Sequence, residues 1–164
     1  MSDHDPFNNP EQANPRAREL MREEFFWDCV DEWAPFGSDE GNDAYYEWRN
    51  WREENKNNEL VECFSWILDG RLNEYNESLI TGECIEKDIE NPDDAFLSEA
   101  YDMFTLDTTI IATALGQLLD EGKIDKNAKP YIMVAIQRQS HPSVCEDDDR
   151  LKILKATMRV VSEA

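Results

Sequence analysis

The stretch from Thr105 to Gln139 constrains the fold most, because it is the only long run with few charged residues. In its first half, apolar residues recur at intervals of three and four. They are Leu106, Ile110, Ile111, Ala114, Leu115, Leu118 and Leu119. This spacing predicts a helix with one broad apolar face. Gly122 is its predicted C-cap, because glycine adopts the left-handed conformation without steric cost.

The second half of this stretch predicts another helix, buried on most of its sides. Its apolar residues are Tyr131, Ile132, Val134, Ala135 and Ile136. Asp125 is a candidate N-cap, although Pro130 leaves the starting residue open. Two helices this apolar cannot face water, so we expect the rest of the chain to cover a central helical hairpin at about 105–139.

Helical periods also occur elsewhere, and no segment alternates with a period of two. They predict helices over residues 16–34, 43–55 and 58–80, one starting at Asn91-Pro92, and a last one after a capping box at 143–146. The 58–80 segment is either one helix that tolerates Gly70 or two helices that meet there. Residues 36–42 are predicted as a turn, with Asn42 or Asp43 capping the next helix, and residues 83–91 as a polar connection of open form.

These patterns predict an all-α fold, a single-domain bundle of six to eight helices over residues 16–164. Residues 1–15 are rich in Asn and Pro and predict a disordered polar tail. Whether Phe7 docks on the body is not decided by the sequence. The aromatic segment Tyr45–Trp51 is interpreted as core, with the alternative that one or two of its rings anchor a partner.

The charge of the chain is unusual, with a formal value of −21 and a sequence pI of about 4.2. Small soluble domains usually carry a net charge of roughly 2–8 in magnitude, and a larger excess costs stability through self-repulsion. Residues 1–100 contain 27 Asp and Glu against 8 Lys and Arg, whereas residues 101–164 contain 10 against 8. The acidity therefore belongs to the first three-fifths of the chain.

This charge distribution favours a basic protein as the partner. It argues against direct binding of nucleic acid or of an anionic membrane, since both require Lys and Arg. Acidity that only keeps the protein dissolved would give the same composition. A salt-adapted organism would also give it, so both alternatives stay open.

The four cysteines form no C-x-x-C pair, the N-terminus lacks a signal-peptide pattern, and no run approaches the roughly 18 apolar residues of a membrane span. We therefore expect reduced cysteines and a cytoplasmic location. Cys29 and Cys63 fall within apolar helical patterns and are predicted to be core residues.

No motif for catalysis or for a cofactor is found. Residues 38–43 are rich in oxygen ligands but do not fit the spacing of an EF-hand loop. His141 and Cys145 are too few for a zinc site, and phosphate-binding glycine loops and hydrolase motifs are absent. We predict no metal, no cofactor, no catalytic residues and no enzymatic activity. An acid–base site hidden among the many carboxylates is the remaining enzymatic alternative.

The predicted partner-binding residues lie in the first third of the chain, where carboxylates recur at helical spacing. They are Glu23, Glu24, Asp28, Asp31, Glu32, Asp39, Glu40, Asp43, Glu47, Glu53 and Glu54, together with Trp51 as an aromatic anchor. Carboxylates four residues apart on a helix stand about 6 Å apart along its axis. Such a row can occupy the cationic groove of a nuclease, a toxin or a DNA-binding protein.

From these observations we expect a non-enzymatic binding protein that neutralises a basic protein, in the manner of an immunity protein or a nucleic-acid mimic. The alternative is a structural or regulatory helical protein, for which the acidity serves only solubility. A homodimer through the apolar hairpin or the Trp-rich helix is one form that such a protein can take.

Overall fold

The computed structural model describes residues 4–164, and this part of the chain contains helices, turns and loops but no strand. Seven α-helices follow one another: α1 (Pro15–Leu20), α2 (Asp39–Glu54), α3 (Leu60–Ile67), α4 (Gly82–Glu90), α5 (Met103–Glu121), α6 (Lys129–Ser140) and α7 (Asp148–Glu163). Six short 3-10 helices lie between them: η1 (Pro10–Gln12), η2 (Glu24–Trp27), η3 (Leu72–Glu74), η4 (Glu77–Ile80), η5 (Pro92–Asp94) and η6 (Lys126–Ala128). The predicted all-α bundle is confirmed.

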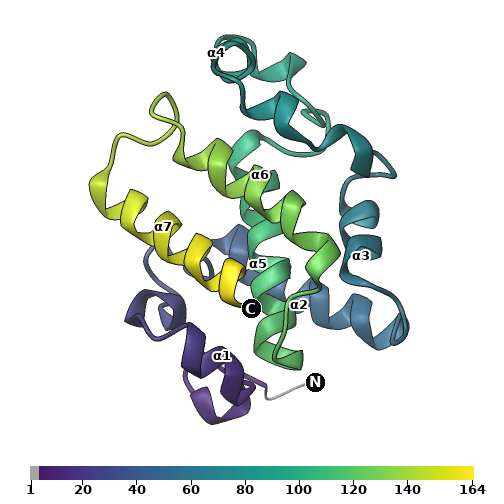
Figure 1. Ribbon diagram of the computed structural model, residues 1–164, viewed down its shortest axis with the longest axis vertical. Helices are drawn as coiled ribbons and strands as arrows, with labels where there is room; N and C mark the ends of the chain where they lie inside the picture. The colour runs from purple at the N-terminus through teal and green to yellow at the C-terminus, as the bar shows by residue number, and fades with distance from the viewer. Residues whose placement is uncertain (1–3) are drawn as a thin grey trace.

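Helix α5 lies at the centre of the molecule and packs against α2 and α6, while α7 packs on α6 (Figure 1). Nearly every α5 residue from Leu106 to Leu119 is buried. The predicted central hairpin is therefore confirmed. Gly122 ends α5 with a φ of 76°, as predicted.

The predicted cap of the second hairpin helix is wrong. Helix α6 begins at Lys129, with Pro130 in its first turn, and Ala128 is its N-cap. Asp125 instead accepts a hydrogen bond from the backbone N–H of Leu60 at 2.8 Å. Its carboxylate therefore satisfies a free donor at the start of α3 rather than at the start of α6.

The N-terminal segment is packed from residue 4 onwards, so the predicted disordered tail is wrong for residues 4–15. Phe7 is buried, and its ring lies 4.8 Å from that of Phe36 and 5.5 Å from that of Tyr45. The N–H of Asn14 donates to the carbonyl of Leu119 at 2.7 Å. This bond satisfies one of the carbonyls that the end of α5 leaves without a helical partner. Residues 1–3 of the predicted tail lie outside the described residues.

Acidification from about pH 7.5 to about pH 5.5 is expected to destabilise the docked N-terminal segment. Burial and the Arg49 guanidinium lower the pKa of His4 from 6.5, against the opposing effect of the Asp120 and Asp5 carboxylates. The His4 Nε2 atom lies 2.7 Å from the Tyr45 hydroxyl. Since the unfolded chain binds this proton more readily, stability falls as the pH drops below the unfolded value.

The measurement for this prediction is the melting temperature at both pH values for the wild type and for His4→Gln. The wild type should lose more stability on acidification than the variant, because Gln does not titrate. The prediction is contradicted if both proteins lose the same amount.

The predicted helix over 16–34 is wrong beyond Leu20. Helix α1 ends there, a single 3-10 turn follows, and residues 28–38 form a loop. Asp28 Oδ1 accepts from the N–H groups of Val30 (2.7 Å) and Asp31 (3.1 Å), and Asp31 Oδ1 accepts from Trp33 (3.0 Å). These side-chain bonds to the backbone compete with helical hydrogen bonds. Cys29 is exposed in this loop, against the prediction, whereas Cys63 is buried as predicted.

The 58–80 segment breaks where Asp69 and Gly70 both adopt left-handed conformations. The N–H of Gly70 bonds back to the carbonyl of Ser65, which ends the helical run. Two 3-10 turns follow instead of a second helix. Residues 82–90, predicted as a connection, form α4 with Thr81 as N-cap.

Two predicted helix starts are also wrong. Asn91-Pro92 opens only a 3-10 turn, and the next helix begins at Met103 with Asp102 as its cap. The predicted capping box at 143–146 does not form, because Asp147 caps α7 by accepting from the N–H groups of Asp149 and Arg150.

Candidate functional site

One face of α2 carries a row of exposed carboxylates. Helix α2 begins four residues before the predicted start, because the hydroxyl of Ser38 accepts from the N–H of Gly41 at 3.1 Å. Asp39, Asp43 and Glu47 follow one another at intervals of four, and all three are exposed. Glu54 lies seven residues further along on the same side and is also exposed. Successive members of this row stand roughly 6 to 10 Å apart along the axis.

The opposite side of α2 is buried against α5. Tyr45 and Trp48 are almost fully covered, which confirms that these rings belong to the core. Trp51 is partly buried and stacks on Trp48 with the ring centres 6.0 Å apart. The structure thus places the predicted aromatic anchor at the edge of the core. Glu40 is half-buried and Glu53 is exposed, on either side of the acidic row.

The loop before α2 holds the other predicted acids. Glu24, Asp31 and Glu32 are exposed, and Glu23 and Asp28 are half-buried. The hydrogen bonds that Asp28 accepts from the backbone lower the pKa of its carboxyl, so it stays ionised at neutral pH. These residues therefore form an acidic loop rather than the predicted helical stripe.

Very few of the predicted acids are neutralised within the protein. Among the ion pairs formed by residues 4–164, only Glu23 of the eleven predicted carboxylates takes part, with Arg159 as its partner. A second contact joins Arg159 Nη2 to Glu23 Oε1 at 2.8 Å and lowers the pKa of Glu23. The other ten carboxylates face solvent without a cationic partner in the described part of the chain.

A groove that the sequence did not predict adjoins this acidic surface. It has a volume of about 960 Å³ and lies between the 29–33 loop, the start of α2, the end of α4 and the start of α5. Three of the four large exposed apolar residues of the described chain line it: Val30 (86% exposed), Trp33 (44%) and Ile89 (47%). Val30 and Trp33 fit the spacing of apolar residues on a helix. The sequence therefore predicted them to be buried, and their exposure was missed.

The groove also contains charged residues, most of them acidic. Glu32, Asp39, Glu40, Asp88 and Asp102 line it, with Arg150 as its single cation. Three of the predicted partner-binding residues therefore meet at the groove, namely Glu32, Asp39 and Glu40. Asp88 and Asp102 were not predicted as site residues, because only the packing of α4 and α5 brings them to this place.

Arg150 holds one wall of the groove in position. Its guanidinium lies 4.5 Å from the centre of the Trp33 ring and 5.6 Å from that of Phe104. It also donates to the side chain of Gln139, whose amide donates to Asp107 at 2.6 Å. The indole of Trp33 thus rests on a buried polar network and not on a mobile surface.

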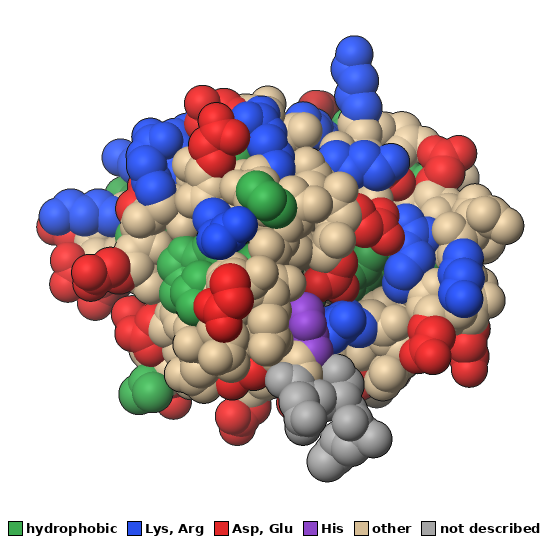
Figure 2. All heavy atoms as spheres, turned by 90° about the horizontal axis from the view of Figure 1, so that it is seen from below, with side chains coloured by type: hydrophobic (Ala, Val, Ile, Leu, Met, Phe, Trp, Pro, Cys, Tyr) green, Lys and Arg blue, Asp and Glu red, His purple; other side chains and the backbone are tan. Residues whose placement is uncertain are grey.

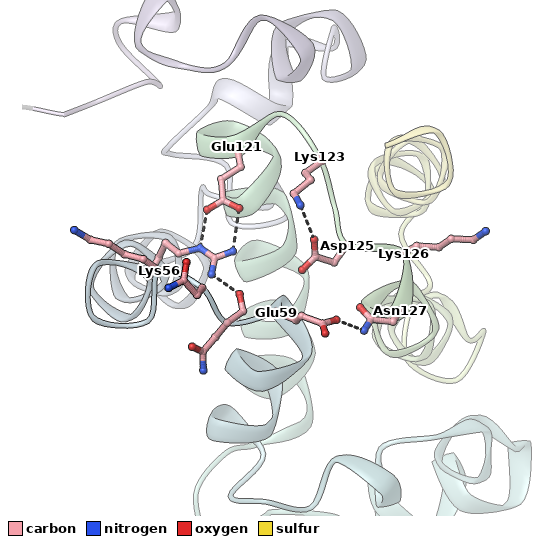
Figure 3. A pocket seen from close by; sticks show the side chains of 10 residues that line it. Lys56, Glu59, Glu121, Lys123, Asp125, Lys126 and Asn127 are labelled. Carbon is pink, nitrogen blue, oxygen red and sulfur yellow. Dashed lines mark hydrogen bonds and ion pairs between the residues drawn. The ribbon is translucent and has the colours of Figure 1, made fainter.

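A second cavity, of about 700 Å³, is less suited to a partner because four of its seven charged side chains pair with one another (Figure 3). Arg52 donates to both carboxylate oxygens of Glu121, at 2.6 and 3.0 Å, and to the carbonyl of Asn55. Lys123 lies 3.3 Å from Asp125. These contacts join the ends of α2 and α5, so we interpret this cavity as structural.

Acidic and basic side chains are not separated everywhere on the molecule. Figure 2 shows one face, seen from below, on which red and blue side chains lie next to one another at several places.

Within residues 4–164, no group of three or more His, Cys, Asp and Glu side chains is arranged to hold a metal ion. None of the helices in this part of the chain is long and apolar enough to cross a bilayer.

Comparison with protein-family models gives no match for this chain, and neither does comparison with curated proteins or with solved structures.

Proposed function

We propose that this protein binds and neutralises a basic protein through the acidic surface formed by residues 24–32, which comprise η2 and the start of the following loop, and by α2. The observation that carries the proposal is the set of ten exposed or half-exposed carboxylates in residues 24–54 that lack an internal cationic partner. Solvated carboxylates that a fold leaves unpaired cost stability through mutual repulsion. A cationic partner relieves that repulsion, so the arrangement favours binding.

The spacing of the acids supports a partner that handles nucleic acid. The α2 row, which runs from Asp39 to Glu54, presents negative charge along about 22 Å of helix axis. A nuclease or DNA-binding protein offers a cationic groove of comparable extent to its substrate. The proposed class is therefore an immunity protein or a nucleic-acid mimic that acts by occupying that groove.

Complementary charge has two consequences for such a complex. It raises the association rate by steering the partner, and it rejects acidic competitors. Both effects weaken with salt because the interacting charges are exposed.

Affinity capture with two charge-reversed variants tests this proposal. The first variant reverses the α2 row through Asp43→Lys, Glu47→Lys and Glu54→Lys. The matched control reverses three exposed acids elsewhere, through Glu77→Lys, Glu83→Lys and Glu86→Lys. Helix α4, which carries two of the control positions, lies at the top of Figure 1, and neither of these two positions lines the groove beside α2. Both variants change the net charge equally.

The wild type and the control should retain the same basic protein from a lysate of the source cells, while the α2 variant should lose it. The captured protein is then purified and mixed with the wild type, and its nuclease or DNA-binding activity should fall as the complex forms. Retention of the same partner by the α2 variant, or capture of acidic proteins only, would contradict the proposal.

A further inference from the structure

We propose that the groove beside the acidic surface receives an apolar side chain of the partner that is flanked by Lys or Arg. This inference rests on the proposed function, and it adds the chemical nature of the contacting segment. The occupant is an extended or helical stretch with one Leu-, Ile- or Met-sized side chain between cationic residues.

The apolar part of the occupant follows from the exposed walls. Val30, Trp33 and Ile89 come from two segments far apart in the sequence, yet all three line the same groove. Burying such side chains removes apolar surface from water at roughly 25 cal/mol per Å². Scattered exposed apolar residues are ordinary, but residues gathered in a concave site mark a binding surface.

The cationic part of the occupant follows from the charges at the same place. Five carboxylates and one guanidinium line the groove, so the site is strongly negative. An uncharged apolar segment would leave these carboxylates to be desolvated without compensation. Lys and Arg on either side of the apolar residue supply that compensation, because their long stems pack on apolar surface while their charged ends reach the acids.

The groove is prepared for this occupant before binding. Arg150 lies 4.5 Å from the centre of the Trp33 ring, and this cation–π contact favours one orientation of the indole before association. Trp is also among the residues most enriched at the centres of protein interfaces. By contrast, the exposed Trp66 (59%) is not among the residues of this groove and serves as a matched control.

Two short fluorescent peptides test the inference by anisotropy. One carries a leucine between two pairs of arginines, and the other has serine in place of the leucine with the same charge. The wild type should bind the leucine peptide about tenfold more tightly, as expected for burial of one apolar side chain. In the double variant Val30→Ser with Ile89→Ser, this preference should fall towards unity. Trp66→Ala should keep it.

The outcomes separate this inference from the proposed function. Equal binding of both peptides by the wild type, with loss of binding in the Asp43, Glu47 and Glu54 reversal, overturns the groove inference and leaves the proposed function intact. A leucine preference in the wild type, together with capture of the same basic protein by the Asp43, Glu47 and Glu54 reversal, supports the groove inference and overturns the proposed role of the acidic row. No binding of either peptide up to about 1 mM overturns the groove inference.

Discussion

Asp107→Asn is expected to lower the free energy of unfolding by about 3–5 kcal/mol, the largest single effect that the structure predicts. Asp107 is fully buried and accepts four hydrogen bonds. Its Oδ1 atom accepts from the Tyr75 hydroxyl at 2.5 Å and from Arg138 at 2.8 Å, and its Oδ2 atom accepts from Arg138 at 2.8 Å and from Gln139 at 2.6 Å.

The cost of this substitution comes from the arginine that stays behind. Arg138 is 1% exposed. Burial by itself would lower the pKa of its guanidinium, but the Asp107 carboxylate raises it above its ordinary value, so the arginine is charged in the core. Asn supplies no compensating charge and only one acceptor oxygen. A buried guanidinium without its counter-ion is strongly destabilising.

The matched control is Asp102→Asn in the same helix. Asp102 is exposed and caps α5 by accepting from the N–H of Thr105 at 2.7 Å. Asn is as good a cap as Asp, so stability should change by about 0.5 kcal/mol or less. Urea unfolding of both variants measures the difference. If both variants lost the same free energy of unfolding, the buried Asp107–Arg138 ion pair would not have the stabilising role described above.

Gly116→Val is expected to cost about 3 kcal/mol, at the upper end of the usual range for overpacking. Even the first added carbon would lie 2.9 Å from Cδ1 of Trp48 and 3.0 Å from Cδ1 of Tyr45. Both rings are fully buried between α2 and α5 and have no room to move. The valine methyl groups would therefore push the two central helices apart.

Gly82→Val provides the comparison for this second substitution. A side chain at position 82 meets only His141 Nε2, at 3.8 Å, and the residue is exposed at the start of α4. Stability should change by about 1 kcal/mol or less, because Val has a slightly better helix propensity than Gly. If both valine variants unfolded at the same urea concentration, the claim that α2 and α5 are in tight contact at Gly116 would be contradicted.

The central hairpin could be predicted from sequence because its apolar residues alone decide its structure. The apolar residues from Leu106 to Leu119 keep a helical spacing around the polar residues Asp107, Thr108, Thr109, Thr113 and Gln117, and that spacing predicts the helix that forms. Gly122 was correctly predicted for the same reason, since a left-handed residue after a long helix favours glycine.

Prediction failed where side chains bond to the backbone. Asp28 and Asp31 each accept backbone N–H groups, which favours a loop over the predicted helix. An Asp residue can cap a helix, stabilise a turn or lie within a helix. Tertiary packing decides among these three, and the spacing of apolar residues in the sequence does not reveal that packing. The same limitation misplaced the starts of α2, α5 and α7.

The sequence predicted which acidic residues belong to the surface, but it did not predict how the fold arranges them. The carboxylates of α2 share an exposed side because helical spacing is a local property. The groove joins Val30, Ile89 and Asp102, and only the tertiary arrangement of the loop, α4 and α5 brings them together. Asp107, a carboxylate among the apolar residues of the first hairpin helix, was a sequence signal for the network that supports the groove.

The central claim is that the acids of residues 24–54 serve to attract a cationic partner. The most direct measurement is the association rate constant with the captured partner, recorded by stopped-flow fluorescence at low salt. The Asp43, Glu47 and Glu54 reversal should slow association by about tenfold or more, and added salt should reduce the difference. The Glu77, Glu83 and Glu86 reversal should slow it much less. Equal slowing by both reversals would contradict the claim, because net charge alone would then account for the attraction.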